Sequence, residues 1–349
     1  MNIYESLGVR PIINATGTFT RLGGSLMPAE VVQAMVAASR HFVCLEELQH
    51  QAGQVIAELT GAETAYVTSG AQAALVLSIA ACITGLDAEK MDRLPDTAGM
   101  KRNVIMAQAQ RNHYDHAVEA AGGRIIEVGT TDLCRPDEVA AAIDEGTAAI
   151  LYLPWPNGNL ALADVVEVAH RHGVPVVVDA AGRCDEPANL TRLVAQGADL
   201  VCFSGGKYIR GPQASGFVCG RRALISAIAW QHLDMDITPQ VWTAPRELVG
   251  AEQLDFVPRQ GIGRGYKAGK EEIIGLVTAL RLYFQRDHAA EKAECLRKLE
   301  AIVAGLAGTP HVTAEILPPN PQRGIIHPFG LQVGDEQTIV RRVKEIVGS

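Results

Sequence analysis

The chain has 349 residues, of which 48% are hydrophobic and 20% charged, and its formal net charge is −8. This composition is typical of a folded protein with a sizeable core. The acidic balance disfavours a general nucleic-acid-binding surface, because neutralising phosphates requires clustered lysine and arginine, but a local pocket for a small anion is compatible with it.

Helical and strand patterns alternate between about residues 50 and 245. The segments with strand character are near-continuous apolar runs at 64–70, 103–108, 124–129, 147–155, 174–182, 198–206 and 214–221. Periodicity or capping residues predict helices at 50–61, 71–85, 114–123, 135–146, 162–173 and 190–197. Helices between apolar strands predict a mostly parallel α/β sheet of seven strands, covered by helices on both faces.

Further features of the sequence bear on where in the cell the protein is located. The longest apolar helical run, 73–85, is too short to span a bilayer, and the first residues lack the features of a signal peptide. The seven cysteines are scattered without a CxxC pair, which predicts reduced thiols rather than disulfides or a zinc site. We therefore expect a cytoplasmic protein with no membrane partner and no metal.

Two residues that follow predicted strands indicate a specific chemistry. In parallel sheets, ligands bind beyond the carboxyl ends of the strands. Asp179 follows three valines, and Lys207 lies in a glycine-lined turn after the next helix and strand. A carboxylate there could be a helix cap or half of a structural ion pair. Alternatively, it could keep a pyridine nitrogen protonated, and a lysine could form the Schiff base, as pyridoxal phosphate requires.

The other strand ends offer weaker signals. Ser69, Gly70 and Ala71 open a predicted helix, so their backbone N–H groups could hold a phosphate or simply form a cap. His113, beside Tyr114, could lie flat over a cofactor ring, although a histidine here is as often a capping or surface residue.

Two glycine-rich segments carry cations. Arg21 lies in 14–25, which otherwise reads as an ordinary loop. Arg264 and Lys267 lie in 259–275, where the alternatives are a solvated face and an anion-binding loop. These three cations are our candidates for binding a substrate carboxylate or phosphate.

Five motifs resemble, in order, those of the fold-type I pyridoxal-phosphate enzymes, the aspartate aminotransferase superfamily. Within it they resemble the selenocysteine synthase-like group, and most of all its D-glucosaminate-6-phosphate ammonia-lyase branch. The motifs are INATGTFTRLGGSLMP (13–28), RNHYDHAV (111–118), VVVDAAG (176–182), FSGGKYIRGPQASG (203–216) and GRGYKAGKEEIIGLVTAL (263–280).

The resemblance implies the cofactor and several roles. It implies pyridoxal 5'-phosphate, with Lys207 as the Schiff-base lysine and Asp179 as the partner of the ring nitrogen. It also implies that the turn 69–71 belongs to the phosphate cup and that Ser204 can reach the phosphate.

The resemblance further implies an aspartate aminotransferase-like architecture. We expect an N-terminal segment over 1–48 that crosses toward the active site and a large cofactor-binding domain over 49–250. A connecting helix and a small α+β domain, shortened relative to the family, would occupy 251–349, with one strand-like piece near 313–317 before the final helix.

The expected activity is α,β-elimination from an amino-sugar acid. Racemisation of an amino acid and a catalytically silent cofactor-binding role are the alternatives. Selenium transfer to tRNA is disfavoured, because the chain is acidic and has no separate N-terminal RNA-binding region. A homodimer or higher even oligomer is expected, since fold-type I sites usually form at a subunit interface.

Overall fold

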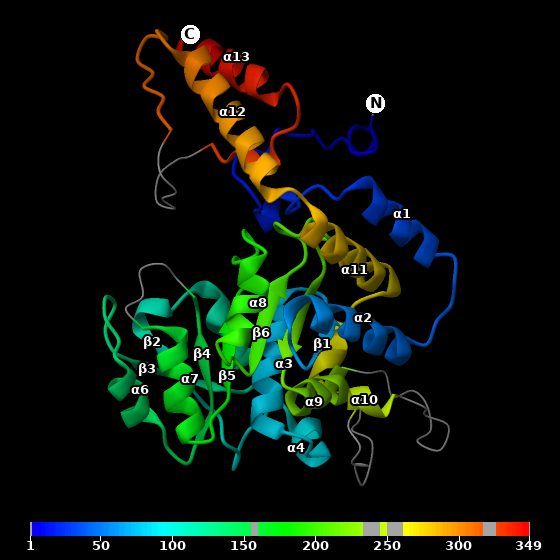
Figure 1. The fold of residues 1–349 in the computed structure, drawn as a ribbon, viewed down its shortest axis with the longest axis vertical. Coiled ribbons are helices and arrows are strands. Elements are labelled where there is room, and N and C mark those ends of the chain that lie inside the picture. The colour runs from blue at the N-terminus through cyan, green and yellow to red at the C-terminus, as the bar shows by residue number, and fades with distance from the viewer. Residues whose placement is uncertain (1, 155–159, 233–244, 250–260, 317–325, 349) are drawn as a thin grey trace. The chain divides into compact units, whose positions relative to one another are not determined.

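One seven-stranded sheet organises the protein, with its strands in the order β1-β7-β6-β5-β4-β2-β3 (Figure 1). The computed structural model describes residues 2–154, 160–232, 245–249, 261–316 and 326–348. The strands are β1 (Thr64–Thr68), β2 (Asn103–Ala107), β3 (Arg124–Val128), β4 (Thr147–Tyr152), β5 (Val176–Asp179), β6 (Leu200–Ser204) and β7 (Gly216–Gly220). Strand β7 is antiparallel to both neighbours and all other pairings are parallel, which confirms the predicted mostly parallel sheet.

Helices connect and cover these strands. They are α1 (Ala29–Ala38), α2 (Leu45–Thr60), α3 (Ala71–Thr84), α4 (Ala88–Arg93), α5 (His116–Ala120), α6 (Pro136–Ala142), α7 (Leu162–Arg171), α8 (Ala188–Ala195), α9 (Arg222–His232), α10 (Arg246–Val249) and α11 (Lys270–Gln285). Short 3-10 turns add η3 (Gln108–Gln110), η4 (His113–Asp115) and η6 (Ile262–Tyr266). No described helix has the length and apolar character needed to cross a membrane.

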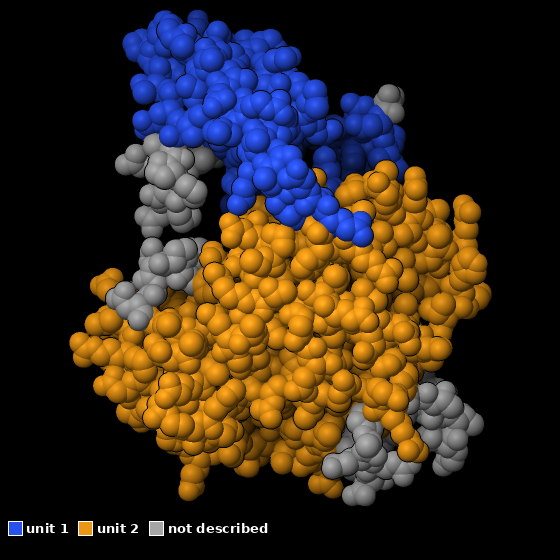
Figure 2. Space-filling view, in the orientation of Figure 1, with its two compact units in different colours: residues 1–26, 285–349 blue, residues 27–284 orange. Residues whose placement is uncertain are grey.

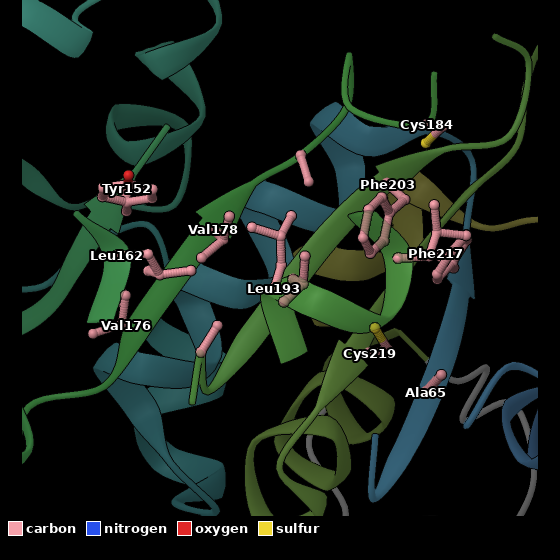
Figure 3. Packing of buried hydrophobic residues seen from close by; sticks show 14 of the residues in the cluster. Ala65, Tyr152, Leu162, Val176, Val178, Cys184, Leu193, Phe203, Phe217 and Cys219 are labelled. Atoms are coloured by element: carbon pink, nitrogen blue, oxygen red, sulfur yellow. The ribbon is translucent and has the colours of Figure 1, made fainter. Parts of the chain in front are cut away.

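The core forms two layers, one on each face of the sheet. On one face, Val176 and Val178 pack with apolar residues of α2, α7, α8 and α11. Figure 3 shows this layer, where Phe203 and Phe217 stack with ring centroids 5.1 Å apart. On the other face, Val177 packs with residues of α3, α5, α9 and α10. Burial on both sides explains why the strands read as continuous apolar runs rather than alternating ones.

The strand register brings distant residues to one edge. Thr68, Gly216 and Ser204 are paired in one row across β1, β7 and β6. On the next strand, Asp179 is paired with Cys202. The segments that follow β1, β5 and β6 therefore leave the sheet at the same edge.

The outer edge of β1 is covered by a side chain instead of a strand. Gln49 of α2 is buried, and its amide donates to the carbonyl of Val67 at 2.9 Å and accepts from the Val67 N–H at 3.0 Å. Helix α2 approaches closely because Gly53 lies against the carbonyl of Ala65, where a Cβ atom would be 2.3 Å from the oxygen. The glutamine thus replaces the hydrogen bonds that a further strand would make.

The chain divides into two compact units, residues 1–26 with 285–349 (unit 1) and residues 27–284 (unit 2) (Figure 2). The sheet lies wholly within unit 2. Unit 1 contains α12 (His288–Leu306), α13 (Asp335–Val347) and the 3-10 turns η1 (Glu5–Leu7), η2 (Thr20–Leu22) and η7 (Pro328–Gly330).

The strand-like piece expected near 313–317 does not form a strand in its described part, 313–316. Instead, Thr16 and His327 form an isolated parallel bridge, and the N–H of His327 donates to the carbonyl of Ala15 at 2.8 Å. A small apolar cluster around Ile302, Leu306 and Leu331 holds the unit together. The N-terminal segment therefore completes the same unit as the C-terminal helices.

Candidate active site

Lys207 lies in a tight turn between β6 and β7. The N–H of Gly211 donates to the carbonyl of Gly205 and the N–H of Arg210 to that of Lys207, at 2.9 and 3.0 Å. Gly205 packs where a Cβ atom would lie 2.2 Å from the hydroxyl of Ser215, so the turn folds back tightly on β7. The turn therefore fixes the backbone of a half-buried lysine whose ammonium has no ion pair or hydrogen bond with a described residue.

Asp179 is buried at the end of β5, with 8% of its surface exposed. One carboxylate oxygen accepts the N–H of Ala181 at 3.1 Å, and no ion pair to it is found among the described residues. Burial raises the pKa of Asp179, while the Ala181 hydrogen bond and the charge of Lys207 lower it. A buried carboxylate with one donor and a nearby lysine is suited to a cationic ring nitrogen, which supplies the missing partner.

The charge of Lys207 also affects the pKa of the Cys184 thiol. Burial raises the pKa of this thiol to about 12, and the charge of Lys207 opposes that shift. The two strand ends after β5 and β6 thus meet around the ammonium. None of the seven cysteines forms a disulfide.

The turn between β1 and α3 leaves the N-terminus of α3 uncapped, which favours the binding of an anion. Gly70 has φ 151°, a conformation that only glycine adopts readily, and no side chain caps the helix that follows. The first N–H groups of α3 therefore have no helical acceptor, which favours a negatively charged ligand. Gly216 lies beneath this turn, where a Cβ atom would be 2.5 Å from the carbonyl carbon of Gly70. The register of β1, β7 and β6 places Ser204 at the same sheet edge as the turn 69–71, which follows Thr68.

The 3-10 turn η6 lies against this helix start. The N–H of Ser69 donates to the carbonyl of Tyr266 at 3.3 Å. Arg264 within η6 is half-buried and Lys267 just after it is exposed. The charge of Arg264 and, more strongly, burial lower the pKa of His232 to about 4, so Arg264 lies near the end of α9. The structure thus brings the cationic segment beside Ser69, but it describes no contact from Arg264 or Lys267 to Lys207 or Asp179.

His113 lies in η4, beyond the end of β2, and is exposed. The turn is held by a reciprocal pair in which Asn112 accepts the N–H of Tyr114 and Asp115 accepts the N–H of Asn112. Asp115 thus closes η4 and gives no side-chain cap to helix α5 that follows, and the stacking role of His113 stays a prediction. Arg21 lies in η2 of unit 1, so its role likewise stays a prediction.

One cation of this edge was missed by the sequence analysis. Arg183 lies in the loop after Asp179, where its N–H donates to the carbonyl of Ala180 at 2.9 Å. The rule that residues beyond strand ends line the site would have included it, had it been extended through the whole loop.

These residues fit pyridoxal 5'-phosphate. Lys207 provides the amine, the buried Asp179 provides a carboxylate in need of a cation, and the uncapped start of α3 provides N–H groups for a phosphate. The close packing of Gly216 keeps that start free of side chains. The three features come from separate strands and lie at one edge of the sheet.

Comparison with known proteins supports the same reading. Residues 12–237 match the family profile of SelA, L-seryl-tRNA selenium transferase. The chain is 36% identical to the D-glucosaminate-6-phosphate ammonia lyase of Salmonella typhimurium, over 87% of this chain and 76% of that protein. It is 34% identical to the 5'-C-glycyluridine monooxygenase-decarboxylase of a Streptomyces species, over 89% of this chain and 73% of that protein.

Solved structures agree with this placement. A D-glucosaminate-6-phosphate ammonia-lyase structure matches with a TM-score of 0.77 and 30% identity, covering 100% of this chain and 98% of that one. The cysteine desulfurase of Thermococcus onnurineus, at 16% identity and a TM-score of 0.54 over 93% of this chain and 92% of that one, shares the fold. The sheet, the site and these matches together show that the chain belongs to the SelA family of fold-type I pyridoxal-phosphate enzymes.

Proposed function

We propose that the protein is an ammonia-lyase that eliminates water and then ammonia from an amino-sugar acid, D-glucosaminate 6-phosphate or a close analogue. The observation that carries this proposal is the meeting of Lys207, the buried Asp179 and the uncapped start of α3 at one sheet edge. The likeness to an ammonia lyase over most of both chains supports the choice of reaction.

Each residue would have a distinct task. When bound, pyridoxal phosphate withdraws electrons from the Cα atom of an amino acid attached to it. Asp179 would hold the proton on its ring nitrogen, and the N–H groups at the start of α3 would hold its phosphate. Lys207 would anchor the cofactor at rest and, once displaced by the substrate amine, would take the proton from Cα.

The net reaction balances without an oxidant. The C–H bond at Cα and the C–O bond at Cβ break, and the hydroxyl leaves as water. Hydrolysis of the resulting enamine consumes one water and releases ammonia, which leaves a 2-keto-3-deoxy acid. If the proton returned to the opposite face of Cα instead, the protein would be a racemase.

Anion binding by Arg21, Arg264 and Lys267 belongs to the same proposal. The placement of Arg264 and Lys267 in a segment that contacts Ser69 supports a role near the cofactor phosphate. We also propose a cytoplasmic location, where the seven cysteines, none of which forms a disulfide, would stay reduced.

The test is turnover by the purified holoenzyme. Ammonia and a 2-keto acid should form together from D-glucosaminate 6-phosphate, and Lys207→Ala should abolish both. Borohydride reduction followed by peptide mass mapping should place the pyridoxyl group on Lys207. Inversion at Cα without keto acid would identify a racemase, and a labelled Lys207 without any turnover would identify a silent cofactor-binding protein. A label on Lys267 or Lys270 would overturn the site.

A further inference from the structure

The loop that follows β5 carries Arg183, whose backbone is fixed by hydrogen bonds and whose charge is not paired with an acidic side chain among the described residues. Arg183 is half-buried, and its guanidinium makes no ion pair or hydrogen bond with any described residue. Because the side chain is partly exposed and its charge is not paired, the guanidinium can bind an anion that reaches this edge of the sheet. Arg183 is therefore a candidate for binding an anionic ligand.

The backbone on both sides of Arg183 is fixed. Before it, Asp179 accepts the N–H of Ala181 at 3.1 Å, and the N–H of Arg183 closes a turn onto Ala180 at 2.9 Å. After it, the carbonyl of Cys184 accepts the hydroxyl of Tyr283, on α11, at 2.8 Å. A side chain on so well anchored a loop is preorganised, which lowers the entropic cost of binding.

Arg183 and Lys207 serve different parts of the sheet edge. Tyr152, whose strand neighbour on β5 is Val178, lies close enough to Arg183 for that charge to lower its pKa against the effect of burial. Asp179 responds to Lys207 in the same way, and Arg183 is not among the groups that shift its pKa. In Figure 3, Tyr152 and Cys184 lie at the same end of the strands, with Val176 at the opposite end. The guanidinium thus lies near Tyr152 on β4, whereas Lys207 follows β6, on the other side of β5.

That separation suggests which substrate group Arg183 meets. The reacting Cα atom and its carboxylate must lie near Lys207, whereas the 6-phosphate of a sugar acid is several bonds away. The hydroxyl of Tyr152 already donates to the carbonyl of Leu160 at 3.0 Å, so Tyr152 offers a wall rather than a donor. A guanidinium is the side chain best matched to a phosphate, because its N–H groups can bind two oxygens at once.

We propose that Arg183 binds the distal phosphate of the substrate and thereby sets the preference for a phosphorylated amino-sugar acid. The proposal rests on the ammonia-lyase function and adds a specificity-determining residue to it. It requires no change in the reaction, because the phosphate is remote from the bonds that break.

The experiment tests whether the effect of replacing Arg183 depends on the 6-phosphate of the substrate. The kcat/KM values of D-glucosaminate 6-phosphate and D-glucosaminate are measured for the wild-type holoenzyme, Arg183→Gln, Arg183→Lys and the control Arg171→Ala. Arg171 is an exposed arginine at the end of α7, where it pairs with Glu167. Arg183→Gln should lower kcat/KM about 10- to 100-fold for the phosphorylated substrate and less than about threefold for the other. Arg183→Lys should recover part of the loss, and Arg171→Ala should change neither.

Equal losses with both substrates, or no loss with either, would overturn the proposal. If the wild-type enzyme turns over neither substrate, the proposed reaction is wrong, and binding then decides the role of Arg183. The probes are D-gluconate 6-phosphate and D-gluconate, which keep the carbon chain and lack the amine, titrated calorimetrically into holoenzyme. Tighter binding of the phosphorylated probe to wild type, lost in Arg183→Gln, supports the proposal. An equal affinity of wild type for both probes refutes it.

Discussion

At the scale of single residues, the carboxylate of Asp179, which we propose as the partner of the cofactor ring nitrogen, opposes folding when it is ionised. Its folded pKa is raised by burial, so the carboxylate favours folding when protonated and opposes it once ionised. For the apoprotein, this contribution to stability is fully present below the unfolded pKa and is lost as pH rises through the folded pKa.

Asp179→Asn should therefore raise the free energy of unfolding of the apoprotein at neutral pH while lowering turnover by at least a hundredfold, because an amide cannot keep the ring nitrogen protonated. Chemical denaturation of the apoproteins and steady-state kinetics of the holoproteins measure the two effects. A variant with near-normal turnover would show that the carboxylate is structural.

His232 is the second informative residue. It is 6% exposed, and its Nδ1 atom is 2.9 Å from the hydroxyl of Tyr66. Its pKa is lowered from 6.5 to about 4, mainly by burial. Below pH 6.5 the imidazole of His232 therefore binds a proton in the unfolded chain, whereas in the folded chain it stays neutral down to about pH 4.

Wild-type stability should accordingly fall as pH drops from about 6.5 to 4, by on the order of 3 kcal/mol from this group, and then level off with respect to it. His232→Gln should lose that part of the pH dependence. Urea titrations at successive pH values, with the exposed His116→Gln as a control, measure it. Parallel curves for wild type and His232→Gln would contradict the assignment.

At the scale of elements, the start of α3 depends on the glycine beneath it. Gly216→Ala would place a Cβ atom 2.5 Å from the Gly70 carbonyl carbon and 2.7 Å from the Ala71 nitrogen, both of them backbone atoms that cannot rotate away. We expect at least a tenfold weaker affinity for pyridoxal phosphate, since the N–H groups that we propose to bind its phosphate must move.

Cofactor titration followed by absorbance measures the change. Gly265→Ala is the matched control, because its Cβ atom would meet nothing within 4 Å. Unchanged affinity in Gly216→Ala would mean that the turn shifts without cost and that its position is not what holds the phosphate.

Helix α1 and the segment after it present an apolar surface. The side chains of Val32, Val36, Phe42, Val43 and Leu45 are between 42% and 103% exposed, although the inner face of the helix is packed through Val31. A helix with apolar residues on both faces is typical of one that is covered on both.

At the scale of the whole molecule, this surface supports assembly from copies of the chain. We expect a homodimer or a higher even oligomer, as closed symmetric assemblies are the common case. The double change Val36→Asp and Phe42→Asp should lower the mass measured by light scattering, whereas Leu133→Asp, on an exposed apolar residue elsewhere, should not. A monomeric wild-type protein with full activity would refute the expectation.

The sequence predicted the sheet well because its strands are buried on both faces. Runs such as 176–179 and 200–204 stand out when every residue is apolar. The antiparallel direction of β7 could not be read from such a run, since direction depends on the connection and not on the composition. Helices α1 and α9 were not predicted, and the expected strand near 313–317 is absent over 313–316, where no neighbouring strand is available to pair with it.

The placement of Asp179, Lys207 and Ser204 at or just beyond strand ends was predictable, because each depends on one strand alone, and their roles in the candidate site stay predictions. The candidate site was not predictable where segments far apart in the chain meet. The contact between Ser69 and Tyr266 joins residues with no common local pattern, and the anchoring of the Arg183 loop by Tyr283 is of the same kind. Such contacts arise from packing between elements, which local periodicity does not contain.

The glutamine that covers the outer edge of β1 also bears on synthesis at the ribosome. Strand β1 is made early, but β7, the one strand that pairs with it in the described part of the chain, follows about 150 residues later. At about 5–20 residues per second, the inner edge of β1 waits roughly 8–30 s for that partner. Gln49 precedes β1 in the chain, so the outer edge can be covered as soon as β1 emerges. During this interval only the inner edge of β1 is left to pair with strands of other nascent chains, because Gln49 already bonds Val67 on the outer edge.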